Sequence, residues 1–270
     1  TAVRAKHAGN ADNSKDVGGA VCAIKPVITG FSSKTAIKSD SGRILASLGL
    51  AVSEENINKI SPYRFEPEVS PHLCVKEFSH SKQDEFYNNM LKFCIEFCQN
   101  NGLQNIRGQQ QELAGDSRYF KSDGGAGDYD DNDGKGCRDY RGFIGSGNSE
   151  SVKIIEGAGG LYSPINYNKT YCDLISDLHN RVENLKITLL AGNYLGTISQ
   201  TISAIRNLMN ENLPLAKVVI NDNIGNQQML GENYDYIKNY FAKNNSVLFE
   251  KLSYLKPNIS NISNVPNVSN

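Results

Sequence analysis

The 270-residue sequence lacks the features that would place it in several common classes of protein. It has no excess of charge of one sign, because 28 Lys and Arg residues stand against 29 Asp and Glu residues. Neither nucleic acid nor an anionic membrane is therefore expected as a partner. No apolar run approaches the roughly 18 residues of a membrane span, and no charged start followed by an apolar core indicates export. The composition favours a globular protein outside the membrane.

Paired cysteines and a nucleophile set are also missing. The six cysteines show no CxxC pairs of the kind that hold zinc. Cys94 and Cys98 are four residues apart on an expected helix, and we interpret them as packing or half-exposed thiols. Free thiols without an export signal indicate a reducing compartment, so the predicted location is the cytoplasm. With only four histidines, no Ser/His/Asp or Cys/His arrangement is found.

Apolar strand patterns alternate with helical patterns along the chain. Strands are predicted within residues 20–30, 152–157, 185–193 and 216–223. Helices are predicted within residues 39–50, 81–100, 196–212 and 233–244. Continuous apolar strands separated by helices are typical of βαβ units, so we predict an α/β fold with a mostly parallel sheet covered on both faces.

Two segments depart from this pattern. Residues 101–150 are rich in Gly, Asp, Gln and Asn, and we interpret them as a mobile insertion between a helix and a strand. Their acidic cluster lacks the flanking helices and closing glutamate of a calcium loop. Residues 256–270 have low complexity and are expected to be disordered. The prediction is one α/β domain over residues 1–255, with that insertion and that tail.

Glu156 ends the strand of the segment "IIEGAGGLYSPI" at 154–165 and is followed by Gly157, Gly159 and Gly160. A buried carboxylate is costly unless it meets a cation, and glycines let the backbone approach a ligand closely. One interpretation is a solvated loop after a strand. The other is an anion and metal site at the carboxyl edge of a parallel sheet, where open α/β folds bind ligands.

The segment "CAIKPVITG" places Lys25 at the end of another strand, with Thr29 a few residues further on. A lysine at this edge suits a carboxylate or phosphate, although a solvated lysine is the simpler interpretation. Asp40 begins a helix that either Ser39 or Asp40 could cap, so Asp40 is either an N-cap or a ligand. A lysine, a hydroxyl and two carboxylates, Asp40 and Glu156, would together make a magnesium–anion site.

Four motifs occur in the order and spacing of one family: "KPVITG", "SPYRFEPEVSPH", "IIEGAGGLYSPI" and "LLAGNYLGTISQT". In these segments the chain resembles dethiobiotin synthetase, of the cobyrinate-synthase type of P-loop ATPases, over roughly residues 21–99 and 151–255. The resemblance implies a P-loop NTPase-like fold, a three-layer sandwich with a mostly parallel central sheet. His72, in "SPH", we interpret as structural.

The resemblance also implies roles for single residues. Lys25 and Thr29 would bind the diamino acid and its carbamate and carry the catalysis, while Asp40 and Glu156 would be magnesium ligands. The remaining implied residues bind nucleotide or substrate through backbone and side-chain groups: Gly157 and Gly159 at the carbamate and phosphates, Leu195, Gly196 and Ser199 at the substrate carboxylate, and Asn221 at the adenine ring. In the family the helix end at Leu195, Gly196 and Ser199 is donated across a homodimer interface.

The implied reaction uses ATP and Mg²⁺ to convert 7,8-diaminopelargonate and CO2 into a ureido ring. One departure bears on it, because the family's phosphate loop G-x-x-x-x-G-K-[ST] does not occur in the sequence. Three explanations stay open: the start of the natural protein is missing, the ATP site is degenerate, or residues 1–20 are not a faithful record of the polypeptide. The alternatives to the ligase are a non-catalytic relative that keeps the fold and dimer, and a cobyrinate-type amidoligase.

Overall fold

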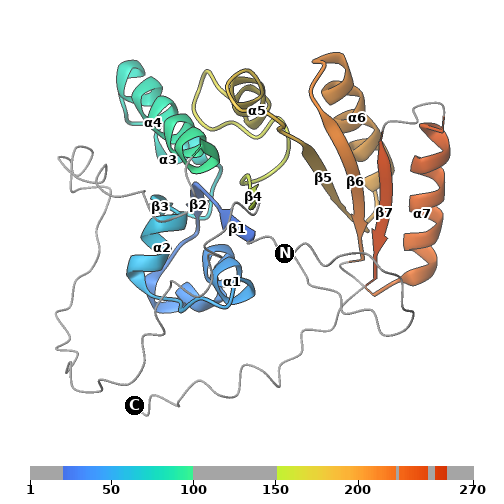
Figure 1. Ribbon diagram of the computed structural model, residues 1–270, viewed down its shortest axis with the longest axis horizontal. Helices are drawn as coiled ribbons and strands as arrows, with labels where there is room; N and C mark the ends of the chain where they lie inside the picture. The colour runs from blue at the N-terminus through green and yellow to red at the C-terminus, as the bar shows by residue number, and fades with distance from the viewer. Residues whose placement is uncertain (1–20, 100–150, 223–224, 243–246, 254–270) are drawn as a thin grey trace, which may run out of the picture. The chain divides into compact units, whose positions relative to one another are not determined.

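The computed structural model describes four stretches of the chain (Figure 1): residues 21–99, 151–222, 225–242 and 247–253. The predicted insertion with its acidic cluster, the predicted tail and the first 20 residues lie outside this part. The chain divides into two compact units, with the boundary between Val182 and Glu183. We call them the N-terminal and the C-terminal unit. The prediction of one domain over residues 1–255 stays a prediction.

The N-terminal unit contains four short strands, five α-helices and one 3-10 helix among its described residues. In chain order they are β1 Val21–Ile24, β2 Val27–Thr29, η1 Ser33–Lys38, α1 Asp40–Ser47, α2 Glu54–Ile60, β3 Tyr63–Phe65, α3 Pro71–Cys74, α4 His80–Gln99, β4 Val152–Ile155 and α5 Tyr171–His179.

Strands β1 and β4 pair in parallel, with Ile24 opposite Ile155 at their carboxyl ends. One further hydrogen bond of 2.9 Å, from the Glu156 amide to the Ile24 carbonyl, extends the ladder past the last pair. Since parallel strands end at the same edge, this register brings the residues after them, Lys25 and Glu156, side by side.

Pro26 divides the predicted 20–30 strand into two, because proline has no N–H to donate to a ladder. After it, β2 pairs in parallel with β3, which the sequence patterns did not predict. The Tyr63 amide donates to the Pro26 carbonyl at 3.2 Å, and the Lys25 amide donates to the Ile60 carbonyl at 3.0 Å. The backbone on both sides of the proline is therefore held by the segment that joins α2 to β3.

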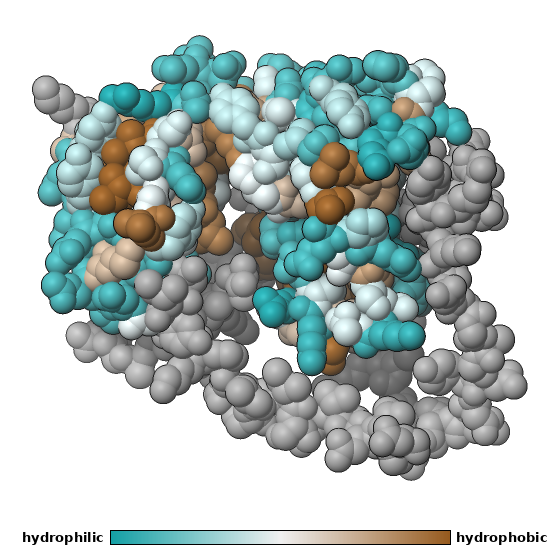
Figure 2. Space-filling view, turned by 180° about the vertical axis from the view of Figure 1, so that it is seen from behind, coloured by the Kyte–Doolittle hydropathy of each residue, from teal (hydrophilic) through white to brown (hydrophobic). Residues whose placement is uncertain are grey.

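The core of the N-terminal unit is built from apolar side chains of every layer. The largest fully buried ones are Ile24, Leu45, Ile57, Ile60, Met90, Phe97 and Ile165. Helix α4 supplies much of this core and corresponds closely to the predicted helix at 81–100. On the face that Figure 2 shows, the coloured surface is mostly hydrophilic, with hydrophobic residues exposed at a few places.

The C-terminal unit is a three-stranded parallel sheet in the order β5-β6-β7, with two helices. Its elements are β5 Ile187–Gly192, α6 Thr197–Asn210, β6 Leu215–Asn221, α7 Gln227–Tyr240 and β7 Leu248–Leu252. Helices α6 and α7 contact each other and the strands they connect, so they cover one face of the sheet (Figure 1). Helix α7 begins at Gln227, six residues before the predicted start, because the Asn226 side chain caps it by accepting from the Met229 amide.

The α/β class with parallel strands is confirmed, since every strand pairing between the described strands is parallel. The short elements α2, β3, α5 and β7 were not predicted. Among the described residues, no helix combines the length and apolar character that crossing a membrane requires. The cytoplasmic location stays a prediction.

Candidate functional site

Lys25 is the centre of a charged cluster at the carboxyl end of β1. Its Nζ lies 2.8 Å from Asp40 Oδ2 and 2.8 Å from Glu156 Oε1. It also donates a longer hydrogen bond of 3.5 Å to the Gly157 carbonyl. The lysine side chain is only 6% exposed, whereas those of Asp40 and Glu156 are 49% and 42% exposed. The solvated lysine considered above is therefore not what the structure contains.

The two carboxylates decide the protonation of this lysine. Burial by itself would lower the pKa of Lys25, because it disfavours the charged amine. Hydrogen bonds and charges from Asp40 and Glu156 outweigh burial, and the pKa of Lys25 is raised above its ordinary value. Lys25 is thus a buried cation held by two partly exposed anions.

Asp40 reaches the cluster from the first residue of α1. The N-cap of this helix is Ser39, whose side chain accepts from the Gly42 amide at 3.1 Å. The N-cap interpretation of Asp40 is therefore wrong. Because the serine satisfies the helix end, the aspartate side chain is left to pair with Lys25.

The glycine-rich segment after Glu156 turns sharply against one serine. Gly159 has φ of +96°, and a Cβ placed there would lie 2.4 Å from Ser163 Oγ. That same Oγ accepts from the Gly160 amide at 2.8 Å. The segment therefore requires a glycine at 159, for both its backbone angle and its space.

Tyr171, at the start of α5, packs against the same glycine-rich segment. A Cβ at Gly157 would lie 3.2 Å from the tyrosine ring. Burial raises the pKa of Tyr171 to about 12, partly offset by a hydrogen bond with the Ala158 backbone. The neutral phenol is therefore a fixed support for the loop, and no sequence pattern indicated this role.

A cavity of about 320 Å³ opens beside the charged cluster. It is lined by residues from three parts of the N-terminal unit: Lys25, Ile28, Thr29, Asp40, Val69, Ser70, Pro71, Ala158, Gly159 and Ser163. Of the predicted site residues, Lys25, Thr29, Asp40 and Gly159 line it directly. Its polar wall combines one ammonium, one carboxylate and three hydroxyl groups, which suits a small polar or anionic ligand.

Ser70 and Ser163 line the cavity, although the sequence patterns predicted no role for either. Both lie within family-like motifs, in the segments "SPH" and "LYSPI", and these motifs were the available signal. Ser70 Oγ donates to the Pro164 carbonyl at 3.4 Å, which joins the two walls. His72 does not line the cavity, and its ring stands edge-on to that of Tyr167 at 5.6 Å between centroids.

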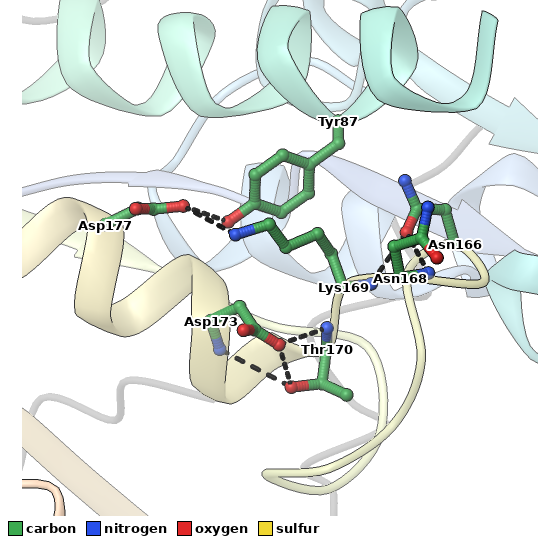
Figure 3. A network of polar contacts seen from close by, with 7 residues as sticks. All are labelled: Tyr87, Asn166, Asn168, Lys169, Thr170, Asp173 and Asp177. Carbon is green, nitrogen blue, oxygen red and sulfur yellow. Dashed lines mark hydrogen bonds and ion pairs between the residues drawn. The ribbon is translucent and has the colours of Figure 1, made fainter. Parts of the chain in front are cut away.

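A polar network fixes the far end of the glycine-rich segment where it enters α5 (Figure 3). Tyr87 of α4 donates to Asp177 Oδ2 at 2.7 Å, and Lys169 Nζ lies 3.6 Å from the same oxygen. Thr170 and Asp173 form a reciprocal capping box at the start of α5. The segment is thus held at one end by the β1–β4 ladder and at the other by α4 and α5.

The remaining predicted residues belong to the C-terminal unit. Asn221 ends β6 and lies opposite Gly192 at the end of β5, so the loop with Leu195 and Gly196 starts from the same sheet edge. Gly196 is the N-cap of α6 with φ of +96°, and Ser199 Oγ donates to its carbonyl at 2.9 Å. Leu195 is 95% exposed.

The two carboxylates of the charged cluster have the chemistry and spacing of ligands for one magnesium ion. Asp40 and Glu156 each direct one oxygen to the same cationic nitrogen, so these oxygens are at most twice 2.8 Å apart. Mg²⁺ in nucleotide enzymes uses one or two carboxylates and completes its shell with water and phosphate oxygens. Groups of three or more His, Cys, Asp or Glu ligands are absent from the part of the chain that the structure describes. Two hard oxygen donors without such a group fit magnesium rather than zinc.

Comparison with known proteins gives one consistent result. Residues 147–267 match the model of an AAA domain family. The chain is 26% identical over 200 residues to the ATP-dependent dethiobiotin synthetase of Acidiphilium cryptum, which covers 74% of this chain and 65% of that protein. It is 26% identical over 203 residues to the enzyme of the same name from Phenylobacterium zucineum, covering 75% of this chain and 63% of that protein.

A third match is shorter but has a higher identity. Over 88 residues the chain is 35% identical to the dethiobiotin synthetase of Halalkalibacterium halodurans, which covers 32% of this chain and 34% of that protein. The matches to the first two relatives span a little less than two thirds of the length of those proteins. The resemblance read from the four motifs is confirmed: the chain is similar to ATP-dependent dethiobiotin synthetases, and its C-terminal part matches an AAA domain family.

Proposed function

We propose that this protein is an ATP-dependent ligase of biotin synthesis that carboxylates 7,8-diaminopelargonate and closes the ureido ring of dethiobiotin. The observation that carries the proposal is the charged cluster beside a polar cavity: Lys25 and Asp40 line the cavity, and Glu156 pairs with Lys25. The similarity to proteins named dethiobiotin synthetase supports the same reaction.

The reaction needs little covalent chemistry from the protein. One amine of the substrate takes up CO2 as a carbamate, and the carbamate oxygen attacks the γ-phosphate of ATP, releasing ADP. The second amine then attacks the carbamate carbon, the ring closes, and phosphate leaves. Each step moves negative charge, so catalysis rests on positioning and charge neutralisation.

In this proposal Lys25 and Thr29 hold the carbamate, because both line the cavity and present hydrogen-bond donors to it. Asp40 and Glu156 would hold Mg²⁺, which when bound neutralises phosphate charge. The backbone of Gly157 and Gly159 would approach the carbamate and phosphates. In these assignments the cation of the cluster, Lys25, binds the substrate, and its two anions, Asp40 and Glu156, bind the metal.

The C-terminal unit would serve a homodimer. Leu195 and the N-cap Gly196 precede α6, and Ser199 lies in its first turn. The N–H groups of this helix start suit a carboxylate, and the resemblance implies that these residues bind the substrate of the neighbouring subunit. Asn221 would contact the adenine ring. Leu195 is almost fully exposed, which is compatible with a role outside its own subunit.

The decisive experiment incubates the purified full-length protein with ATP, MgCl₂, bicarbonate and 7,8-diaminopelargonate, with dethiobiotin detected by mass spectrometry. Dethiobiotin and ADP in equal amounts are expected, and omission of the diamino acid should stop ADP release. A protein that binds ATP and the diamino acid yet makes no product would refute the proposal.

A second candidate is a relative that keeps the fold but lacks catalysis. The observation that favours it is the absence of G-x-x-x-x-G-K-[ST] from the 270 residues. Calorimetry with ATP and magnesium separates the two, because a degenerate nucleotide site leaves ATP binding undetectable while the diamino acid still binds. A cobyrinate-type amidoligase would instead consume ATP with a corrinoid acid and ammonia.

A further inference from the structure

The ion pairs of Lys25 have an unusual distribution of exposure. The cation is 6% exposed while its two anions are 49% and 42% exposed, so the lysine approaches the carboxylates from inside the protein. Lys217 offers a comparison, since its Nζ lies at the same 2.8 Å from Glu250 Oε1. There the lysine is 34% exposed, and its partner Glu250 belongs to β7, an edge strand of the C-terminal sheet.

Both carboxylates of the cluster direct an oxygen to a single point, the Lys25 nitrogen. A divalent cation held by Asp40 and Glu156 needs the electron pairs and the negative charge of these same groups. A doubly charged ion and an ammonium that share two carboxylates repel each other at short range. Simultaneous, full-strength binding of both cations is therefore unfavourable.

We propose that Lys25 and a divalent cation compete for Asp40 and Glu156, so that cation binding releases the Lys25 ammonium toward the cavity. The proposal rests on the metal assignment of the proposed function. It gives Lys25 two positions: one paired with the carboxylates, and one directed at an anionic ligand beside Thr29. Metal binding thereby prepares the cavity for the carbamate.

The first test measures Mn²⁺ binding by the free-ion signal in electron paramagnetic resonance, without nucleotide or substrate. Lys25→Met removes the competing charge and keeps an unbranched side chain of similar length, so it should bind Mn²⁺ about tenfold or more tightly than wild type. Lys217→Met is the matched control, because it breaks an ion pair of the same length outside the cluster, and it should leave the Kd unchanged.

A second test uses the wild-type protein and does not depend on the folding of a variant. An amine-acylating reagent followed by mass spectrometry reports how accessible each lysine is. Saturating Mg²⁺ should increase the acylation of Lys25 relative to Lys217, because release from two carboxylates frees its amine. Unchanged or reduced labelling of Lys25 would refute the competition.

The outcomes separate this inference from the proposed function. Equal and measurable Mn²⁺ affinity in wild type and Lys25→Met overturns the competition and leaves the metal site in place. Absence of Mn²⁺ binding in every variant overturns the metal site itself, and the competition with it. Tighter binding in Lys25→Met that disappears in Lys25→Met/Glu156→Gln supports both.

Discussion

At the residue scale, Lys25 shows how a buried charge, which is costly to remove from water, is stabilised. An ammonium buried to this degree is unfavourable unless anions compensate it, and here Asp40 and Glu156 do so at 2.8 Å each. Removing one member of the cluster leaves the charge of the remaining members without full compensation, which is unfavourable. The cluster is therefore sensitive to single changes that leave the rest of the protein intact.

Substitution of either end of this cluster is expected to stop the reaction. Lys25→Ala and Glu156→Gln should each lower kcat/KM by roughly 100-fold or more, the usual effect of removing a charged group that stabilises a transition state. Steady-state ADP release measures this. The control is Lys217→Ala, which removes a partly exposed lysine that pairs with Glu250 outside the cluster. Near wild-type turnover in both cluster variants would refute the site assignment.

Gly159 should be more sensitive than other glycines with positive φ. Gly159→Ala and Gly49→Ala share the strain of a positive φ, about 1–2 kcal/mol for an L-residue, but only at Gly159 would the added Cβ meet an atom, Ser163 Oγ. We expect Gly49→Ala to lower the free energy of unfolding by this strain alone. Gly159→Ala should lower it further and should also remove most of the activity. Urea unfolding measures the difference, and equal losses would contradict the role of the contact.

At the scale of elements, helix α1 is placed by its contact with η1. Gly42 of α1 faces the 3-10 helix so closely that a Cβ would lie 2.2 Å from the Ala36 carbonyl oxygen. This approach sets the position of the helix start, and with it that of Asp40. A glycine inside a helix is here the condition for close packing of two elements.

The effect of alanine should therefore have opposite signs in two helices. Gly42→Ala forces η1 away from α1 and should destabilise the protein by about 1–3 kcal/mol, as overpacking does. Gly231→Ala in α7 meets nothing within 4 Å and should stabilise by about 0.5–1 kcal/mol. Thermal unfolding followed by circular dichroism tests both. A stabilised Gly42→Ala variant would show that the approach of η1 is not required.

The capping box of α5 predicts a stability change that depends on pH. Burial would raise the pKa of Asp173, but hydrogen bonds from the Thr170 side chain and backbone and the charge of Lys169 outweigh it, so the pKa of Asp173 is lowered. A lowered native pKa stabilises the fold above the unfolded-state pKa, and this contribution is lost as pH falls through the native pKa.

Asp173→Asn should therefore cost about 1 kcal/mol at pH 7, the usual value of a cap. The difference from wild type should shrink as pH falls below about 4, the unfolded-state pKa of aspartate. Urea unfolding at several pH values measures it, with the exposed Asp235→Asn in α7 as control. A penalty that stays constant down to pH 2 would exclude ionisation as its source.

At the scale of the whole molecule, the predicted site residues divide between the two units. Lys25 and its carboxylates belong to the N-terminal unit, while Leu195, Gly196 and Ser199 belong to the C-terminal unit. The resemblance implies that the α6 end of one subunit completes the site of another. In that arrangement an active protein would require two chains, each of which contributes a different part.

Mixed variants test this shared site. Leu195→Asp places a negative charge at the start of α6, where it should repel the substrate carboxylate, and Lys25→Ala disables the other part of the site. Each variant alone should be inactive, but unfolded and refolded together they should recover about a quarter of wild-type activity through hybrid dimers with one intact site. No recovery from a mixture shown to be dimeric by light scattering would refute the shared site.

Local patterns were sufficient to predict the α/β class, the parallel strands and the helices α1, α4 and α6, because apolar spacing depends only on near neighbours in the chain. They also placed Lys25 and Glu156 at strand ends. The short elements α2, β3 and β7 were not predicted from the sequence, because segments of three to seven residues show too little apolar periodicity. The start of α7 was missed because the cap at Asn226 was not recognised.

The sequence by itself determined which charged residues follow the strands, because strand ends are marked by local signals such as Pro26 and the glycines after Glu156. Only the tertiary structure decided that Lys25 meets Glu156, 131 positions away, since that contact depends on the register of β1 against β4. It alone also decided that Ser70 and Ser163 line the same cavity as Lys25. These are contacts between distant segments, and no local pattern encodes them.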